Sequence, residues 1–210
     1  VNFENILNCS IIKNLTLGVD PKLFTYSQIK RFFLKNNKVK FIKKNLIDEI
    51  KKQKVNDIAP FYSIDKSVTG ESTSSKLNKI TNYLKTVKSD HIFISAPENV
   101  AWILNIRGED GINSPLPNSR LIISKSRKIY LFSKLKKCKK LLKDKIIKSN
   151  QIIDIRKFQK KISDLKGRKF IIDENSCSIF FENIIKSRFK IIGRNDPTYY
   201  WKAIKNKVEI

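Results

Sequence analysis

The sequence predicts an α/β protein, with a mixed, mostly parallel sheet, flanking helices, and part of a similar α/β domain in front of it. Three observations support this fold class. Short segments rich in Ile and Phe alternate with helical segments of roughly 10 to 15 residues, as in βαβ units. The apolar segments 121–124 and 128–133 are close enough to form a hairpin. A chain of 210 residues is also long enough to bury a core.

Residues 1–53 show a short alternating pattern of their own. The expected elements are a strand over 16–20, a helix over 25–36, a strand over 39–44 and a helix over 45–53. Asn45 is a suitable N-cap for the second helix, because its side chain can accept a hydrogen bond from a free backbone N–H. We expect this segment to be the C-terminal part of a first α/β domain.

Residues 54–70 lack periodicity and contain Pro60 and Gly70, which indicates a linker. A second α/β domain is expected over 71–195. Its helices are predicted over 73–88, 97–104, 134–147, 156–166 and 176–187, and its strands over 91–95, 121–124, 128–133, 151–155, 169–174 and 189–193. Asp196-Pro197 begins a last helix that runs to Ile210. Because the chain starts at Val1, contains no Met and ends within this helix, we expect both natural termini to lie outside it.

The formal net charge is +25, from 44 basic and 19 acidic residues. Such a charge can indicate a nucleic-acid partner. However, most of the basic residues are lysines scattered among Ile and Asn, the residues that A/T-rich codons specify, and this second explanation is favoured. We expect no membrane partner, because no apolar run reaches the length of a membrane span.

Residues that could build a self-sufficient active site are missing. The three cysteines (Cys9, Cys138 and Cys177) are widely spaced, which favours a reducing, cytoplasmic compartment over a disulfide framework or a zinc site. His91 is the one histidine and begins a strand, so a structural role is expected. The acidic pairs Glu109-Asp110 and Asp173-Glu174 are weak candidates for a metal or catalytic site, because neighbouring strand residues point to opposite faces.

Residues 101–110, AWILNIRGED, look like the end of a buried helix that opens into a loop displaying an arginine. This segment resembles one found in the Xaa-Pro aminopeptidases of the creatinase/prolidase superfamily. Three shorter segments, LGVDP (17–21), TGES (69–72) and KAIKNKVEI (202–210), resemble segments of the same family in the same order. The resemblance extends across the chain, although residues 1–53 match only at LGVDP.

The resemblance implies the end of a first creatinase-like N-terminal domain over residues 1–53, all of a second over 71–195, and the start of a catalytic "pita-bread" domain over 196–210. The parent enzyme would be a metallo-aminopeptidase that releases the N-terminal residue next to proline. It would use two divalent metals, usually manganese, bound by residues beyond Ile210. This region would then hold no metal and no catalytic residue. It would serve dimerisation and substrate access, with its own catalytic domain and a peptide with proline in second position as partners.

The resemblance also gives residues of the loop candidate roles. Arg107 and Asn105 are the candidate substrate-binding residues, since a guanidinium could orient a peptide carboxylate or carbonyl. Trp102, Gly108 and Asp110 would support the loop. Asn105 and Gly108 are expected to allow the turn through positive φ. The competing interpretation, that Arg107 only braces the loop by pairing with Asp110 or Glu109, is favoured. Two further readings of the whole chain stay open, a nucleic-acid-binding module and a catalytically inactive homologue.

Overall fold

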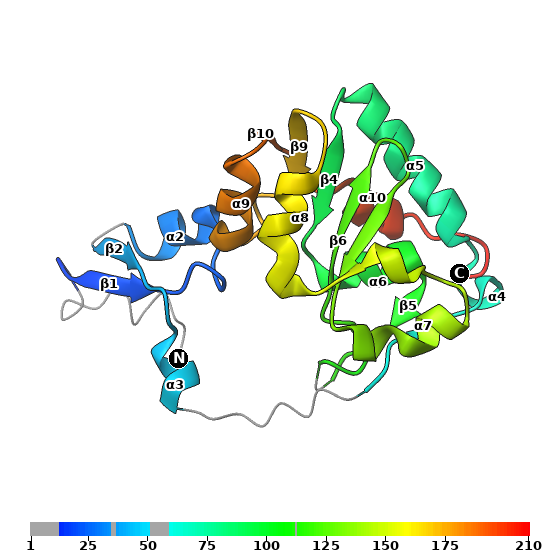
Figure 1. Cartoon of the computed structure of the whole chain (residues 1–210), viewed down its shortest axis with the longest axis horizontal. Helices are drawn as coiled ribbons and strands as arrows, with labels where there is room; N and C mark the ends of the chain where they lie inside the picture. Colours follow the sequence, from blue (N-terminus) through cyan, green and yellow to red (C-terminus); the bar gives the residue numbers. More distant parts are fainter. Residues whose placement is uncertain (1–12, 35–36, 51–58, 112) are drawn as a thin grey trace. The chain divides into compact units, whose positions relative to one another are not determined.

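The computed structural model describes residues 13–34, 37–50, 59–111 and 113–210 (Figure 1). The chain divides into two compact units, which are described separately below. Unit 1 comprises Val1–Val55 and Glu174–Asn183, and unit 2 comprises Asn56–Asp173 and Ile184–Ile210. The sequence-based predictions for residues 35–36 and 51–58, and for Cys9, lie outside the described residues.

Unit 1 contains a small βαβ arrangement. Strand β1 (Thr16–Val19) pairs in parallel with β2 (Lys38–Phe41), and α2 (Tyr26–Phe32) connects them. Thr25 caps α2 in a capping box with Gln28. The predicted N-cap of α3 (Leu46–Ile50) is confirmed, since Asn45 Oδ1 accepts a hydrogen bond from the Ile47 N–H at 3.0 Å. The buried side chains of this unit include Ile179, at the start of α9 (Ile179–Lys186).

Unit 2 is built on a six-stranded mixed sheet in the order β10-β9-β4-β6-β7-β8. The strands are β4 (His91–Ile94), β6 (Arg120–Ser124), β7 (Ile129–Phe132), β8 (Ile152–Ile153), β9 (Lys169–Ile172) and β10 (Lys190–Gly193). The pairs β10/β9, β9/β4 and β7/β8 are parallel, whereas β4/β6 and β6/β7 are antiparallel. The predicted α/β class with a hairpin between residues 121 and 133 is therefore confirmed.

The helices of unit 2 cover both faces of this sheet. The α-helices are α4 (Lys66–Thr69), α5 (Thr73–Thr86), α6 (Pro97–Leu104), α7 (Lys139–Lys143), α8 (Phe158–Asp164) and α10 (Pro197–Ala203), and the 3-10 turns are η2 (Leu135–Cys138), η3 (Ser149–Gln151) and η4 (Ile155–Lys157). Along β4, Ile92 and Ile94 join the core that includes α5 and α6, while Phe93 packs on Phe158 of α8. Because both faces are buried, the strands are almost continuously apolar.

Three predicted segments differ in the structure. After Ile58, the predicted linker contains β3 (Tyr62–Ser63), which pairs with β5 (Ile106–Arg107), and α4, and Phe61 is fully buried. The predicted helix over 134–147 is instead η2 followed by α7, which ends in a Schellman-type turn with Lys145 at φ 56°. The last helix ends at Ala203, and Asn206 Nδ2 then donates to the Thr69 carbonyl at 3.0 Å.

Candidate functional site

The candidate loop begins where α6 ends. Pro97 occupies the first turn of this helix, where its missing N–H is tolerated. Val100, Ile103 and Leu104 are buried, and Trp102 packs against the same core. Asn105 caps the C-terminus in the left-handed conformation, with φ 52° and ψ 45°, which Asn accepts more readily than most residues. The predicted turn at Asn105 is therefore present, and it directs the chain into β5.

A buried lysine holds this helix end. The Lys76 side chain on α5 is only 1% exposed. Its ammonium donates to Asn105 Oδ1 at 2.6 Å and to the Trp102 carbonyl at 2.9 Å, and it lies 4.1 Å from the centroid of the Trp102 ring. Asn105 Nδ2 in turn donates to the Glu71 carbonyl at 2.8 Å. The helix C-terminus, with its partial negative charge, thus receives a cation.

Burial lowers the pKa of Lys76 to about 8, and the carboxylates of Glu71 and Glu209 oppose this shift. Sequence reasoning did not identify Lys76 as a site residue. A signal was present, because Lys76, Ile80 and Leu84 follow one another at four-residue spacing on the buried face of α5. A lysine in such an apolar stripe needs a polar partner inside the protein.

Arg107 lies in β5 opposite Tyr62 of β3. It is partly buried, and its Nη1 donates to the carbonyl of the preceding Ile106 at 2.9 Å. Within the described part of the chain, Arg107 forms no ion pair. Pairing of Arg107 with Asp110 or Glu109 is therefore not the arrangement in this structure, and the guanidinium keeps donors that a ligand could engage.

Asp110 is held by two other groups. Its carboxylate accepts from the buried ammonium of Lys137 and from the Asn118 N–H, the latter at 2.7 Å. Lys137 also lies near the ring of Phe61. These contacts connect the two ends of the loop that leads from β5 to β6.

Glycine is required at position 108 because of close packing, and not because of a positive φ as the sequence suggested. Its φ is not positive, so the prediction of a left-handed glycine there was wrong. A Cβ at this position would instead meet Phe61 Cδ1 at 2.8 Å and Pro117 Cα at 2.9 Å. The loop packs so closely on Phe61 that only glycine fits.

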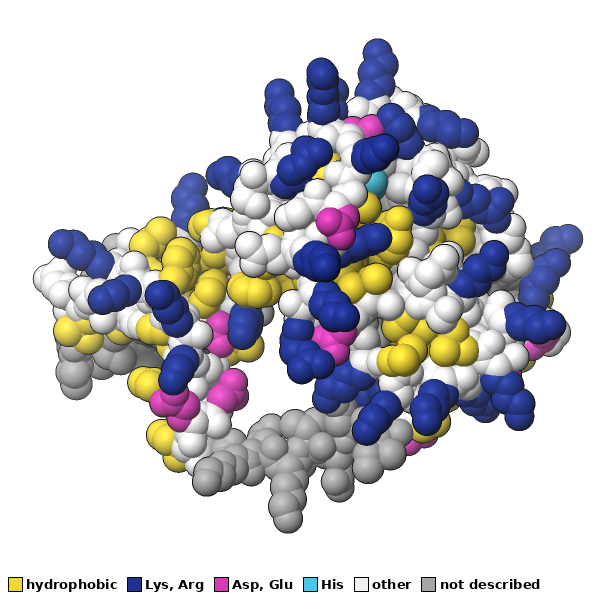
Figure 2. Space-filling model, in the orientation of Figure 1, with side chains coloured by type: hydrophobic (Ala, Val, Ile, Leu, Met, Phe, Trp, Pro, Cys, Tyr) yellow, Lys and Arg dark blue, Asp and Glu magenta, His cyan; other side chains and the backbone are white. Residues whose placement is uncertain are grey.

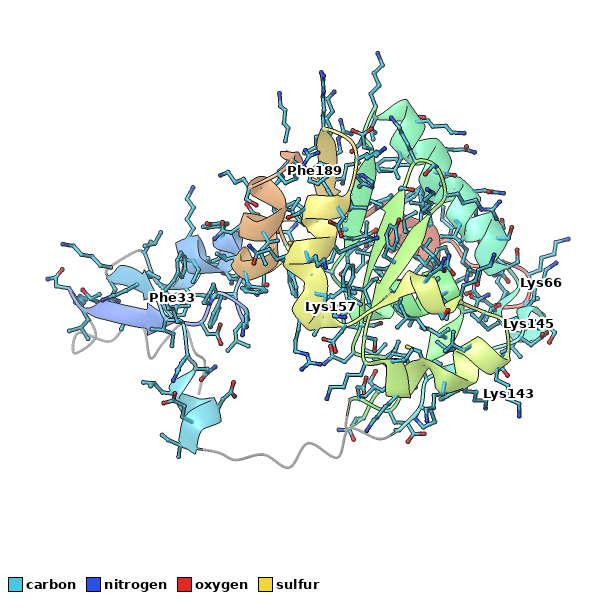
Figure 3. The ribbon with its side chains drawn as sticks, viewed as in Figure 1. Phe33, Lys66, Lys143, Lys145, Lys157 and Phe189 are labelled. Carbon is cyan, nitrogen blue, oxygen red and sulfur yellow. The ribbon has the colours of Figure 1, made fainter. Side chains whose placement is uncertain are left out.

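Beside this loop lies an open hollow of about 610 Å³. It is lined by Tyr62, Glu109, Asp110, Gly111, Ser114 and Pro115. The structure thus brings Asp110 to the hollow, whereas Asn105 is buried beneath the loop and Arg107 is not among the lining residues. Figure 3 shows the side chains of this region as sticks.

Within the described part of the chain, the other residues singled out from the sequence form no second site. His91 Nε2 lies 2.7 Å from the Lys166 carbonyl, which can only accept, so Nε2 carries the proton and the buried Nδ1 has no partner among the described residues. Burial lowers the pKa of His91. Asp173 is buried and Glu174 is exposed, and both follow the end of β9 at Ile172 rather than lying in the predicted strand over 169–174. Among the described residues, no three His, Cys, Asp or Glu side chains are placed to hold a metal ion.

The sequence is similar to those of known aminopeptidases. The Xaa-Pro aminopeptidase 1 of Dictyostelium discoideum is 27% identical over 152 residues, which is 71% of this chain and 24% of the relative. An Xaa-Pro aminopeptidase of Caenorhabditis elegans is 36% identical over 73 residues, 35% of this chain and 12% of that relative. The chain therefore spans about a quarter or less of these relatives.

Among solved structures, the X-prolyl aminopeptidase of Caenorhabditis elegans has a similar fold. It is described as a cytosolic enzyme with a di-nuclear active site, and it matches with a TM-score of 0.81 and 23% identity over 99% of this chain and 36% of that one. The family model of the creatinase/prolidase N-terminal domain matches residues 52–209, which include almost all of unit 2. This chain belongs to the creatinase/prolidase N-terminal domain family.

Proposed function

We propose that this chain is the non-catalytic amino-terminal region of a metal-dependent Xaa-Pro aminopeptidase, which releases the N-terminal residue of a peptide when proline follows it. The observation that carries the proposal is the family match over residues 52–209. Two further findings support it. Relatives that share this region are Xaa-Pro aminopeptidases, and the chain spans only about a quarter of the Dictyostelium enzyme.

The metal centre is proposed to lie outside this chain. The Caenorhabditis relative is described as having a di-nuclear active site. The described residues do not fit such a centre, since they offer no cluster of three side chains able to hold a metal ion. No catalytic step is therefore assigned to residues of this chain. We propose that other parts of the complete protein bind two divalent metal ions, and that these ions are manganese.

The region is proposed to contact its own catalytic domain, to take part in a homodimer and to restrict access to the active site. Exposed apolar side chains at the C-terminal end of unit 2 support the first of these contacts. Tyr200 is 70% exposed, and Ile204 and Val208 are also exposed. A cytoplasmic location is proposed as well. Among the described residues, no helix is long and apolar enough to cross a membrane.

The loop after α6 is the part of this chain that we propose to meet the substrate. Arg107 would orient a peptide carboxylate or carbonyl through guanidinium donors that no carboxylate of the described residues occupies. Asn105 would act by fixing the turn, because both ends of its amide are engaged by Lys76 and Glu71. Trp102, Gly108 and Asp110 would hold the loop through the contacts described above.

The function is tested with the complete gene product. Sequencing downstream of Ile210 should show a continuation with spaced Asp, His and Glu residues. The purified product should release the first residue from Xaa-Pro peptides, lose this activity with a chelator and regain it with manganese. A continuation without such ligands would identify an inactive homologue. A protein with the ligands that fails to cleave Xaa-Pro peptides would refute the proposed reaction.

The role of Arg107 is tested by Arg107→Lys in that enzyme. Lysine keeps the charge but loses the planar fork that binds a carboxylate bidentately. We expect KM for short peptides to rise on the order of tenfold, as for the loss of one charged hydrogen bond, with little change in the melting temperature. Unchanged KM and kcat with a lower melting temperature would mean that Arg107 only supports the loop.

A further inference from the structure

One segment of unit 2 is denser in lysine than the rest of the chain. Eight of the fifteen residues 134–148 are Lys, and Asp144 is the only acidic residue among them. Over the whole chain, 44 of 210 residues are Lys or Arg. The segment is therefore more than twice as basic as the chain around it, which an even codon bias does not explain. Figure 2 shows basic side chains over much of the visible face of the protein.

The fold presents these lysines to solvent on a fixed scaffold. Cys138, Leu141 and Ile147 are buried and anchor η2 and α7 to the core. Six lysines between and beside these anchors are exposed, namely Lys136, Lys139, Lys140, Lys143, Lys145 and Lys148. We call these six residues the lysine surface. Asp144 lies among these lysines and carries one negative charge against their six positive charges, and its carboxylate accepts a hydrogen bond from Ser63 at 3.4 Å.

The surface extends from α7 toward α4. Lys140 lies 5.9 Å from the ring centroid of Tyr62, so β3 packs beside α7, and α4 follows β3 directly. Figure 3 labels Lys66, Lys143 and Lys145 at the same end of unit 2. The like charges of these side chains are not paired with carboxylates in any ion pair of the described residues. Such a concentration of positive charge attracts an anionic surface.

Two apolar side chains lie among the lysines and indicate which anionic surface fits. Leu135 is 57% exposed and Ile146 is 37% exposed. Apolar side chains beside lysines gain free energy at the boundary between lipid headgroups and acyl chains. Nucleic-acid surfaces typically use arginine and stacked aromatic rings, and residues 134–148 contain neither.

We propose that η2 and α7 form a docking surface for a membrane rich in anionic phospholipid, to which the protein binds peripherally. The lysine surface would contact the lipid phosphates, and Leu135 and Ile146 would enter the headgroup region. This proposal is independent of the peptidase function. It departs from the expectation of no membrane partner, because that expectation rested on the lack of a membrane-spanning run, which peripheral binding does not need. It concerns a face of unit 2 formed by α7, and the candidate loop after α6 is not part of it.

The test measures sedimentation of the full chain with phosphatidylcholine vesicles, with and without phosphatidylserine. Binding is expected only to the phosphatidylserine vesicles and should weaken as salt rises. Replacing Lys136, Lys139 and Lys143 by Gln should weaken it on the order of 100-fold, at about 1 kcal/mol per lysine near the surface. Leu135→Ser should weaken it roughly fivefold. Circular dichroism checks that each variant is folded.

A matched control removes the same charge elsewhere in unit 2. The exposed residues Lys157, Lys160 and Lys166 are replaced by Gln, and binding should fall by less than about threefold. An equal loss in the control would refute the proposal, because diffuse net charge would explain the binding. No binding to either vesicle would refute it too. A single-stranded oligonucleotide serves as the competitor. The surface would be a nucleic-acid surface instead if the oligonucleotide displaced the protein from the vesicles and if its own binding needed Lys136, Lys139 and Lys143 but not Leu135.

Discussion

Replacing Lys76 by Met tests how a buried charge supports the loop after α6. At neutral pH, two effects of the substitution oppose each other. Loss of the ammonium leaves the buried Asn105 Oδ1 without a donor, which costs about 1–3 kcal/mol. The Trp102 carbonyl also loses the lysine but still accepts from the Asn105 N–H at 3.4 Å. The substitution also removes the cost of burying a charge, and the lowered pKa sets the size of that second effect.

The pKa of Lys76 falls from 10.5 to about 8 on folding. The unfolded chain therefore binds more protons between these values, so the free energy of unfolding rises with pH across this window. The charge costs the folded state about 3 kcal/mol at pH 7, at about 1.4 kcal/mol per pKa unit. About 2 kcal/mol of this cost is removed between pH 7 and pH 9.5. The neutral amine can still donate to both acceptors, so the contacts persist.

The assay is urea unfolding at several pH values, followed by the fluorescence of Trp102 and Trp201, which both lie in unit 2. Wild type should gain about 2 kcal/mol relative to Lys76→Met between pH 7 and pH 9.5. Lys85→Met, at an exposed position of the same helix, should follow the wild-type curve. Parallel curves for wild type and Lys76→Met across this window would refute the assignment of a buried, titrating ammonium to Lys76.

Two further predictions concern the stability of unit 2. Gly108→Ala places a Cβ within 2.9 Å of both Phe61 and Pro117, so it should lower the free energy of unfolding by about 1–3 kcal/mol. A change below about 0.5 kcal/mol would mean that the loop relaxes without cost. For His91, burial lowers the pKa below 6.5, so wild type should lose stability as pH falls through 6.5 toward that lower value. His91→Phe, beside Phe170 and Phe189, should flatten this loss in acid unfolding curves, and an unchanged slope would contradict the reasoning.

Much of unit 2 could be predicted from local sequence. Helix α6 has the predicted bounds because Pro97 fits a first turn and Asn105 accepts the left-handed cap. The strands were recognisable because burial on both faces leaves them almost wholly apolar. The hairpin β6/β7 followed from the short distance between two such segments. These features depend on residues that are close in sequence.

Other features depend on contacts between segments that are distant in sequence. Hydrophobic periodicity and turn residues do not predict such contacts. The predicted linker appeared irregular, yet Phe61 is fully buried and β3 pairs with β5, more than forty residues later. The predicted helix over 134–147 breaks because the turn at Lys145 returns Ile147 to the core. In each case, tertiary packing outweighs local propensity.

The α/β class, the order of most elements and the resemblance carried by residues 101–110 could all be obtained from the amino-acid sequence alone. Apolar periodicity and turn chemistry are local properties, so they can be read from one chain. The partners of the candidate loop, in contrast, became visible only in the folded chain. Lys76 comes from α5 to hold Asn105, and Lys137 rather than Arg107 pairs with Asp110. The sequence does not show which opposite charge or carbonyl will lie beside a given charged residue. A charged side chain needs a polar partner only where it is buried, and burial depends on how distant segments pack in the folded chain.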